Sequence, residues 1–452
     1  MSNSAQPTTP STVYLDYMEA GISARKDAVR PAEEVTWDYP NQSLLWREAQ
    51  EVGEGLRDDL RDLAFDLHDH PEEAFEEFHA RDAIVSLLAR HGVTASTGVY
   101  GLQTSLEARF STPGFNPDTD PTIAILAEYD ALPEIGHACG HNIIAAAGVG
   151  AFLTSISALS IEGAPQGRIV LLGTPAEEGH SGKQYMIAEG AFEGIDAAIM
   201  IHPFGFDVAE HAWVGRRTMT ATFRGVSAHA SAQPFMGRNA LDAASLAYQG
   251  FGLMRQQMPP SDRFHAVITE GGNRPSVIPD EATLSIYVRS LLPEALLDLS
   301  RRVDDILDGA ALMAGVGVEK QWDIHPASLP VRNNHALAVR WARTQSGRGR
   351  TALPAGVLPD TVAASTDFGN VSHLVPGIHP MVKISPENVA LHTRAFAEFT
   401  RTEEAVDGAV DAAIGLAQVA IDALADPLLL QAATAEFEAA GGQLRVEEYL
   451  DS

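Results

Sequence analysis

The sequence predicts an α/β protein in which helices flank a mainly parallel sheet, with a smaller ferredoxin-like β-α-β-β-α-β domain inserted into it. Continuous apolar runs at 122–129, 168–173 and 197–201 are separated by helical segments, as is typical of buried parallel strands. After Trp213 the pattern changes to alternating strands and amphipathic helices. That change indicates a separate domain with the split βαβ order.

The N-terminal third is predicted to be helical around the first strand. Its first forty or so residues are polar and contain proline, and we expect a loosely held arm that leads into a helix. Apolar residues recur every three or four positions from Ser43 to Gly92, which predicts helices broken near 68–71. Residues 142–160 are long enough to span a bilayer but lack flanking basic residues, so we expect a buried helix of a soluble domain.

The inserted domain and the return to the larger domain can be placed in the same way. We expect four strands and two helices in the insert, at 218–224, 239–257, 264–270, 282–290, 294–313 and 318–324. The larger domain resumes near 326 and ends in an Ala-rich helix at 403–425. The predicted division is therefore 1–214 and 326–452 for the larger domain, and 215–325 for the insert.

Composition limits the classes of function. The 452 residues carry a formal net charge of -29, which repels phosphate backbones and anionic lipid, so neither nucleic acid nor a membrane is an expected partner. The chain has one cysteine and begins without a basic stretch followed by an apolar run. Both features favour a reducing cytoplasmic location.

Side chains that can bind a metal follow each of the three predicted parallel strands. Asp130 and the run 137–142 come after the first strand, Glu177 and Glu178 after the second, and His202 after the third. Because ligands bind beyond the carboxyl ends of strands in open α/β sheets, these side chains are predicted to share one site.

The residue types point to a transition metal and a general base. Cys139 and His141 lie two apart on a predicted turn, and thiolate, imidazole and carboxylate together suit zinc or a similar ion. Glu177 and Glu178 can divide the work, with one carboxylate on the metal and the other on a water molecule beside it. His392 alone is a weak signal.

A set of short motifs resembles one known family. The motifs are DALP (130–133), HACGHN (137–142), AEEG (176–179), IHP (201–203), GVSAHA (225–230) and LHT (391–393). In this order they resemble the dinuclear metallopeptidase family of aminoacylases and carboxypeptidases, and within it the hippurate and auxin-conjugate amidohydrolases. The segments 365–372 and 67–75 most resemble the branch that holds the B-type subunit of aminobenzoyl-glutamate hydrolase and related dipeptidases.

The resemblance implies a role for individual residues around two divalent metal ions, zinc or manganese first, with cobalt or nickel also suitable. Cys139 matches the bridging ligand, and the other metal ligands are matched by His141, Glu178, His202 and His392. Glu177 matches the general base, Asp130 matches the carboxylate that orients a ligand, and Glu128 departs from the family's ligand pattern.

The resemblance also implies that the insert is a lid and dimerisation domain. His229 matches a histidine that reaches the site of the other protomer of a homodimer and stabilises the oxyanion. Asn273 and Arg289 fall in lid segments that bind the carboxylate side of the substrate.

The sequence therefore predicts a metal-dependent amidohydrolase. Its substrate would be a small molecule with a free carboxylate: an N-acyl or N-aroyl amino acid, an amino-acid conjugate or a dipeptide. A water molecule between the two metals would be deprotonated by Glu177. Two alternatives stay open at this point, a cysteine hydrolase with Cys139 as nucleophile and a non-catalytic partner chain of the same fold.

Overall fold

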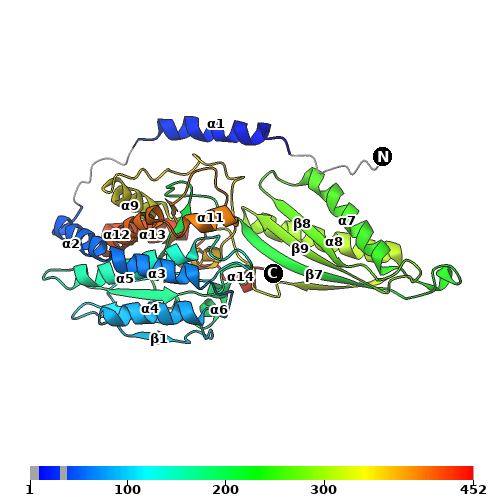
Figure 1. The fold of residues 1–452 in the computed structure, drawn as a ribbon, viewed down its shortest axis with the longest axis horizontal. Helices are drawn as coiled ribbons and strands as arrows, with labels where there is room; N and C mark the ends of the chain where they lie inside the picture. The colour runs from blue at the N-terminus through cyan, green and yellow to red at the C-terminus, as the bar shows by residue number, and fades with distance from the viewer. Residues whose placement is uncertain (1–9, 31–37, 451–452) are drawn as a thin grey trace.

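A six-stranded sheet forms the centre of the larger domain in the computed structural model, which describes residues 10–30 and 38–450 (Figure 1). Its order is β1 (Ala95–Thr97), β2 (Leu106–Ser111), β4 (Arg168–Gly173), β3 (Thr122–Ala127), β5 (Ala197–Ile199) and β11 (Gly377–Ile378). Neighbours among β4, β3, β5 and β11 pair in parallel, whereas β2 pairs antiparallel with both β1 and β4. All six residues of β3 are buried, as the apolar run predicted.

Helices cover this sheet. The elements are α2 (Gln42–Gly55), α3 (Arg57–Asp69), α4 (Phe78–Arg90), α5 (His141–Leu159), α6 (Gly182–Ala188), α9 (His335–Ser346), α10 (Phe368–Ser372), α11 (Arg394–Phe399), α12 (Glu403–Ala425), α13 (Pro427–Ala439) and α14 (Val446–Leu450). α5 packs on β3 and β4 and is covered in turn by α2, α3 and α12. A Cβ on Gly148 would lie 2.7 Å from the carbonyl oxygen of Leu126, so this small residue lets α5 approach the strand closely.

Both long apolar helices are core helices by burial. α5 and α12 are long and apolar enough to cross a membrane, but 89% of the apolar window of each is buried inside the fold. This agrees with the buried helix expected at 142–160.

The insert is a four-stranded antiparallel sheet with two helices on one face (Figure 1, right). Its elements are β7 (Gly215–Arg224), α7 (Ala240–Met254), β8 (Arg263–Glu270), β9 (Glu281–Ser290), α8 (Pro293–Ala314) and β10 (Gly317–Trp322), with two short 3-10 turns at Pro234–Met236 and Arg255–Gln257. The sheet order β10-β7-β9-β8 and a separate hydrophobic core confirm the predicted β-α-β-β-α-β fold.

A helix in the N-terminal arm and a short parallel ribbon are among the elements that were not predicted. The N-terminal arm contains a helix, α1 (Val13–Ala28), which touches the larger domain through Arg25 Nε to the carbonyl of Val357, at 2.7 Å, and through a Lys26–Glu387 ion pair. Figure 1 shows this helix lying apart from the other helices, along the outside of the molecule. A two-stranded parallel ribbon of β6 (His202–Phe204) and β12 (Met381–Lys383) extends the region just beyond β5. This ribbon fixes the position of His202.

Candidate metal centre

The carboxyl ends of β3, β4 and β5 deliver their polar side chains to one cleft of about 870 Å³, and the sheet of the insert forms its opposite wall. His141 is the first residue of α5, directly after Gly140, whose φ of 83° is left-handed. Ala176, before the glutamate pair, also has a positive φ (59°), and its N–H donates to Glu77 Oε1 at 2.8 Å. These local constraints aim the ligands of two strands at the same point.

In the two buried histidines of the site, His141 and His202, a hydrogen bond to one ring nitrogen leaves the other available to bind a metal. His141 Nδ1 lies 2.9 Å from Asp130 Oδ1, and its Nε2 has no hydrogen-bond partner among the described residues. His202 Nδ1 lies 2.8 Å from the carbonyl of Pro203, so that nitrogen donates and Nε2 keeps its lone pair. This arrangement, with one nitrogen held by an oxygen and the other free, is the usual one for histidines that bind metals.

The candidate ligands form two sets of three that share Cys139. The ligand atoms of Cys139, His141 and His202 lie within 4.8 Å of one another, and so do those of Cys139, Glu178 and His392. Cys139 Sγ is 3.5 Å from His202 Nε2 and 3.3 Å from His392 Nε2. A sulfur between two ligand sets, beside an unpartnered buried imidazole nitrogen, fits a pair of divalent ions bridged by a thiolate.

The two adjacent glutamates are in different electrostatic states. Burial and the charge of Glu178 raise the pKa of Glu177 well above its ordinary value. Burial opposes ionisation of Glu178 as well, but hydrogen bonding to His392 and the charge of His141 lower its pKa overall. Neighbouring carboxyls with pKa values pushed apart suit a proton-transfer group and a ligand respectively. The ligand atoms of His141, Glu177 and Glu178 also lie within 4.8 Å of one another, so the pKa directions rather than the distances distinguish the two glutamates.

A buried lysine behind the site was not found from the sequence. Lys183 Nζ forms ion pairs with Glu128 and, at 2.7 Å, with Asp367 Oδ1, and all three side chains are buried. The backbone N–H of Asp367 donates to Glu177 Oε1 at 3.3 Å. Glu128, outside the predicted metal shell, therefore supports the site through Lys183 while its free Oε2 lies 3.6 Å from His141 Nε2. The only sequence signal was the 365–372 motif, which contains Asp367.

The wall contributed by the insert is basic. Arg289 lines the cleft together with Arg216 and Arg263. The Arg289 guanidinium lies 4.7 Å from the centre of the Tyr287 ring, and burial lowers the pKa of Arg289. A partly desolvated guanidinium facing a metal site is suited to bind a carboxylate.

Two predicted residues do not reach this cleft in their own chain. His229 is exposed, and its Nδ1 accepts from the backbone N–H groups of Ser231 and Ala232. Asn273 lines a separate depression in the insert beside Ala230. Within the described part of the chain, neither side chain is among those that line the cleft at Cys139.

The comparison with protein families identifies the chain. Residues 124–418 match the model of peptidase family M20/M25/M40. This range contains the side chains that follow all three strands, His392 and the whole insert. The chain belongs to the M20 family.

Relatives along nearly the full length agree with this assignment. The Xaa-Arg dipeptidase of Mus musculus is 35% identical over 430 residues, which cover 94% of this chain and 98% of that protein. The B-type subunit of the p-aminobenzoyl-glutamate hydrolase of Escherichia coli is 29% identical, and the match covers 86% of this chain and 93% of that protein. Both relatives are hydrolases of amide bonds by name, and this M20 chain is likewise a hydrolase acting on amide bonds.

Solved structures show the same fold at lower identity. A dinuclear metal binding peptidase of the M20 family from Bacillus subtilis has a TM-score of 0.63 at 21% identity and covers 82% of this chain and 99% of that one. An aminobenzoyl-glutamate utilization protein from Klebsiella pneumoniae has a TM-score of 0.61 at 21% identity, with 82% and 97% covered.

Membership of the M20 family decides against a cysteine hydrolase. Burial and then the charge of Glu178 raise the pKa of the Cys139 thiol well above its ordinary value. A thiol that resists ionisation is a poor nucleophile, whereas a bound cation would stabilise the thiolate as a ligand.

Proposed function

We propose that this M20 hydrolase is a dinuclear metallodipeptidase, which cleaves the amide bond of dipeptides or N-acyl amino acids that carry a free carboxylate. The observation that carries the proposal is the pair of ligand sets sharing Cys139, with the raised-pKa carboxyl of Glu177 beside them. Membership of the family gives the reaction class. The cleft adds the candidate metal ligands on one wall, for the amide bond, and arginines on the other, for the free carboxylate.

The ligand chemistry suits zinc or manganese first, and cobalt or nickel as well. Cys139, His141 and His202 would hold one ion, and Cys139, Glu178 and His392 the other. When bound, the ions lower the pKa of a coordinated water and polarise the amide carbonyl.

Glu177 moves the proton. Its side chain is held by the Asp367 N–H, and burial with Glu178 raises its pKa, so its ionised form is a stronger base toward the attacking water than an ordinary carboxylate. Glu177 then passes that proton to the leaving nitrogen, which must be protonated before the amide bond breaks. Asp130 keeps His141 in one tautomer and orientation throughout.

The basic wall selects the substrate's carboxylate. Arg289 and Arg263 line the cleft from the insert, opposite the strand ends that hold the ligand sets. A carboxylate bound there would place the preceding amide bond toward Glu177. A dipeptide with a C-terminal basic residue is the first substrate to test, because of the mouse Xaa-Arg relative and because a net charge of -29 attracts cationic ligands.

The chain is further proposed to act as a homodimer in the cytoplasm. His229 lies outside its own cleft and carries an imidazole that could donate to an oxyanion. Dimerisation through the insert would bring His229 to the site of the partner. Mixing His229→Ala chains with Glu177→Gln chains tests this, because only a shared site would restore part of the activity.

The decisive test of the reaction is Glu177→Gln. Loss of the proton acceptor should lower kcat by about 10²–10⁴-fold while the metal content stays that of the wild type. Glu73→Gln is the matched control, since Glu73 also lines the cleft but is exposed and belongs to no ligand group among the described residues. Wild-type turnover by Glu177→Gln would refute the role of Glu177.

A second candidate function is that of one subunit of a two-subunit hydrolase, which is active only when a different partner chain is bound. Two Escherichia coli relatives are named as the two different subunits of one hydrolase, and the A-type one is 31% identical over a match that covers 40% of this chain. Turnover of a dipeptide by this chain purified alone would exclude that requirement.

A further inference from the structure

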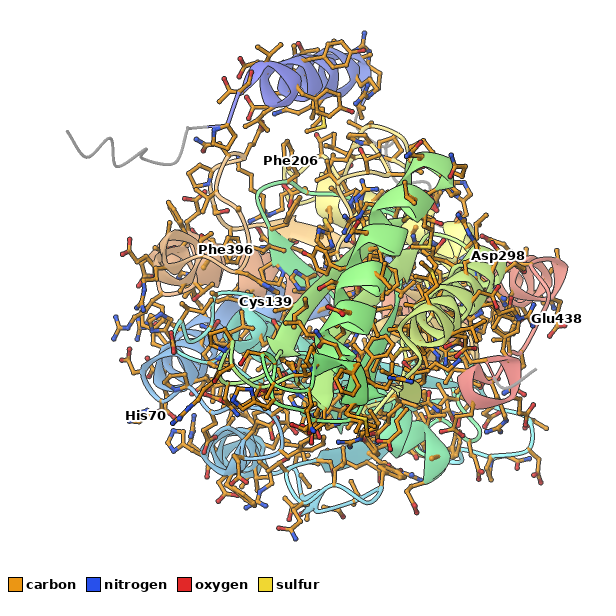
Figure 2. All side chains as sticks on the ribbon, turned by 90° about the vertical axis from the view of Figure 1, so that its right-hand side faces the viewer. His70, Cys139, Phe206, Asp298, Phe396 and Glu438 are labelled. Atoms are coloured by element: carbon orange, nitrogen blue, oxygen red, sulfur yellow. The ribbon has the colours of Figure 1, made fainter. Side chains whose placement is uncertain are left out.

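A second cluster of metal-binding side chains lies where α3 ends and α4 begins. Asp66 Oδ2 is 2.9 Å from His79 Nε2, and Asp66 Oδ1 is 3.1 Å from His70 Nδ1. The two imidazole rings lie with their centres 4.6 Å apart. Figure 2 shows His70 at the periphery of the molecule and Cys139 well inside it, so this cluster is separate from the catalytic ligand sets.

The cluster has the dimensions of a tetrahedral site. Ligands about 2.0–2.1 Å from a zinc ion at tetrahedral angles are about 3.3–3.4 Å apart. The observed separations are 3.1 Å from His70 Nδ1 to Asp66 Oδ1 and 2.9 Å from His79 Nε2 to Asp66 Oδ2, and one ligand atom from each of the three residues lies within 4.8 Å of the other two. Two imidazoles and one carboxylate would leave the fourth position to water, and the half-exposed side chains (39%, 59% and 43% for Asp66, His70 and His79) leave room for it.

The surroundings favour a cation. His70 is the residue that caps α3, and the carboxyl end of a helix carries partial negative charge. Glu72 accepts from the N–H groups of His79 and Ala80, at 2.9 Å each, which offsets the positive amino end of α4. His70 Nδ1 also lies 2.9 Å from the main-chain carbonyl oxygen of Asp66, so an ion bound to this nitrogen would displace the proton that it donates there.

The loop closed by this cluster is a wall of the catalytic cleft. Residues 70–77 connect α3 and α4, and Glu73 and Ala74 line the cleft. The carbonyl of Glu72 accepts from the Ala131 N–H at 2.8 Å, and Glu77 accepts from Ala176, next to the general base. Tying the two ends of this loop together would therefore stabilise one side of the substrate site.

We propose that Asp66, His70 and His79 form a separate surface site for a divalent cation of the zinc type, which clamps the ends of the 70–77 loop. The ion would replace the hydrogen bonds that Asp66 now makes to the two histidines. This site does not depend on the two catalytic ions or on the identity of the substrate.

Zinc titration of the metal-loaded enzyme tests the site. Calorimetry should detect one more zinc-binding event per chain in the wild type than in the His70→Gln, His79→Gln double variant. His91→Gln is the matched control, because His91 is also a surface histidine beside a carboxylate, Asp59 at 2.7 Å, but belongs to no three-ligand cluster among the described residues. Hydrogen exchange in residues 70–77 should slow on zinc addition in the wild type and in His91→Gln, and stay unchanged in the double variant.

The outcomes separate this site from the catalytic one. Equal zinc stoichiometry in the wild type and the double variant would overturn the proposal, as would a loss of the event in His91→Gln. Zinc that binds at the catalytic cleft would appear in all three proteins and cancels in the comparison. If amide hydrolysis proved absent in every protein, the proposed function would fail while the zinc stoichiometry would still decide the surface site.

Discussion

The buried ion triad around Lys183 offers a prediction of known sign and size. Lys183 has a side chain that is 0% exposed and faces two carboxylates, Glu128 and Asp367, that are 1% and 0% exposed. Burial opposes the charged lysine, yet these carboxylates raise its pKa overall. Lys183→Met would remove the cation and leave two buried carboxylates without compensation.

The expected loss follows from the cost of breaking a buried pair. Removing one partner of a buried ion pair costs about 3–5 kcal/mol, because the other charge stays buried. The larger domain has roughly 340 residues, so its entropy of unfolding is about 0.7 kcal/mol/K at ~2.1 cal/mol/K per residue. The melting temperature of that domain should therefore fall by roughly 4–7 °C.

Calorimetry of the wild type and two variants measures this. The triple variant Glu128→Gln, Lys183→Met, Asp367→Asn has no buried charge at these positions, and it should recover most of the loss. Differential scanning calorimetry at one protein concentration and pH gives all three melting temperatures. An unchanged melting temperature for Lys183→Met, or a triple variant as unstable as the single one, would refute the reasoning.

Three further substitutions test other parts of the structure. Burial and then the charge of Asp130 raise the pKa of Glu77 from 4.5 to about 7. The protonated carboxyl therefore stabilises the folded state by about 3 kcal/mol below pH 4.5, and this stabilisation is lost as the pH rises through 7. Glu77→Gln should flatten that part of a plot of melting temperature against pH. Arg289→Met should raise KM about 10–100-fold with a smaller change in kcat, because it removes a charged hydrogen bond to the carboxylate; an unchanged KM would exclude it from substrate binding. A Cβ on Gly369 would overlap the carbonyl oxygen of Leu329. Gly369→Ala should therefore lower the free energy of unfolding, measured in urea, by at least about 2 kcal/mol. Wild-type stability of this variant would contradict that packing.

The main features of the fold could be predicted because their signals are local. The run at 168–173 matches β4 residue for residue, and the Ala-rich helix at 403–425 matches α12. Continuous apolar runs and helical periodicity need no knowledge of distant parts of the chain. The strand-end rule then brought Asp130, Glu178 and His202 together before any distance was known.

The rest depends on contacts between distant residues. Lys183 pairs with Glu128, 55 residues away, and with Asp367, 184 residues away, and a lysine in a short helix gives no local sign of such partners. β6 has only three residues and exists because β12 pairs with it. α1 lies in a polar segment without a marked apolar face, and it contacts the larger domain through Arg25 and Lys26 and buries Ile22. The sequence places His229 and Asn273 in the insert, but the roles proposed for them would involve a second protomer or the shape of a loop, which no local pattern gives.

The central claim is that two ions share Cys139, and a difference in metal content tests it most directly. Elemental analysis of the wild type and of Cys139→Ala, purified in parallel, removes any contribution from surface sites. We predict two more divalent ions per chain in the wild type, with amide hydrolysis that is lost on chelation and restored by a divalent ion. Equal metal content in the two proteins, or hydrolysis that resists chelation, would contradict the claim.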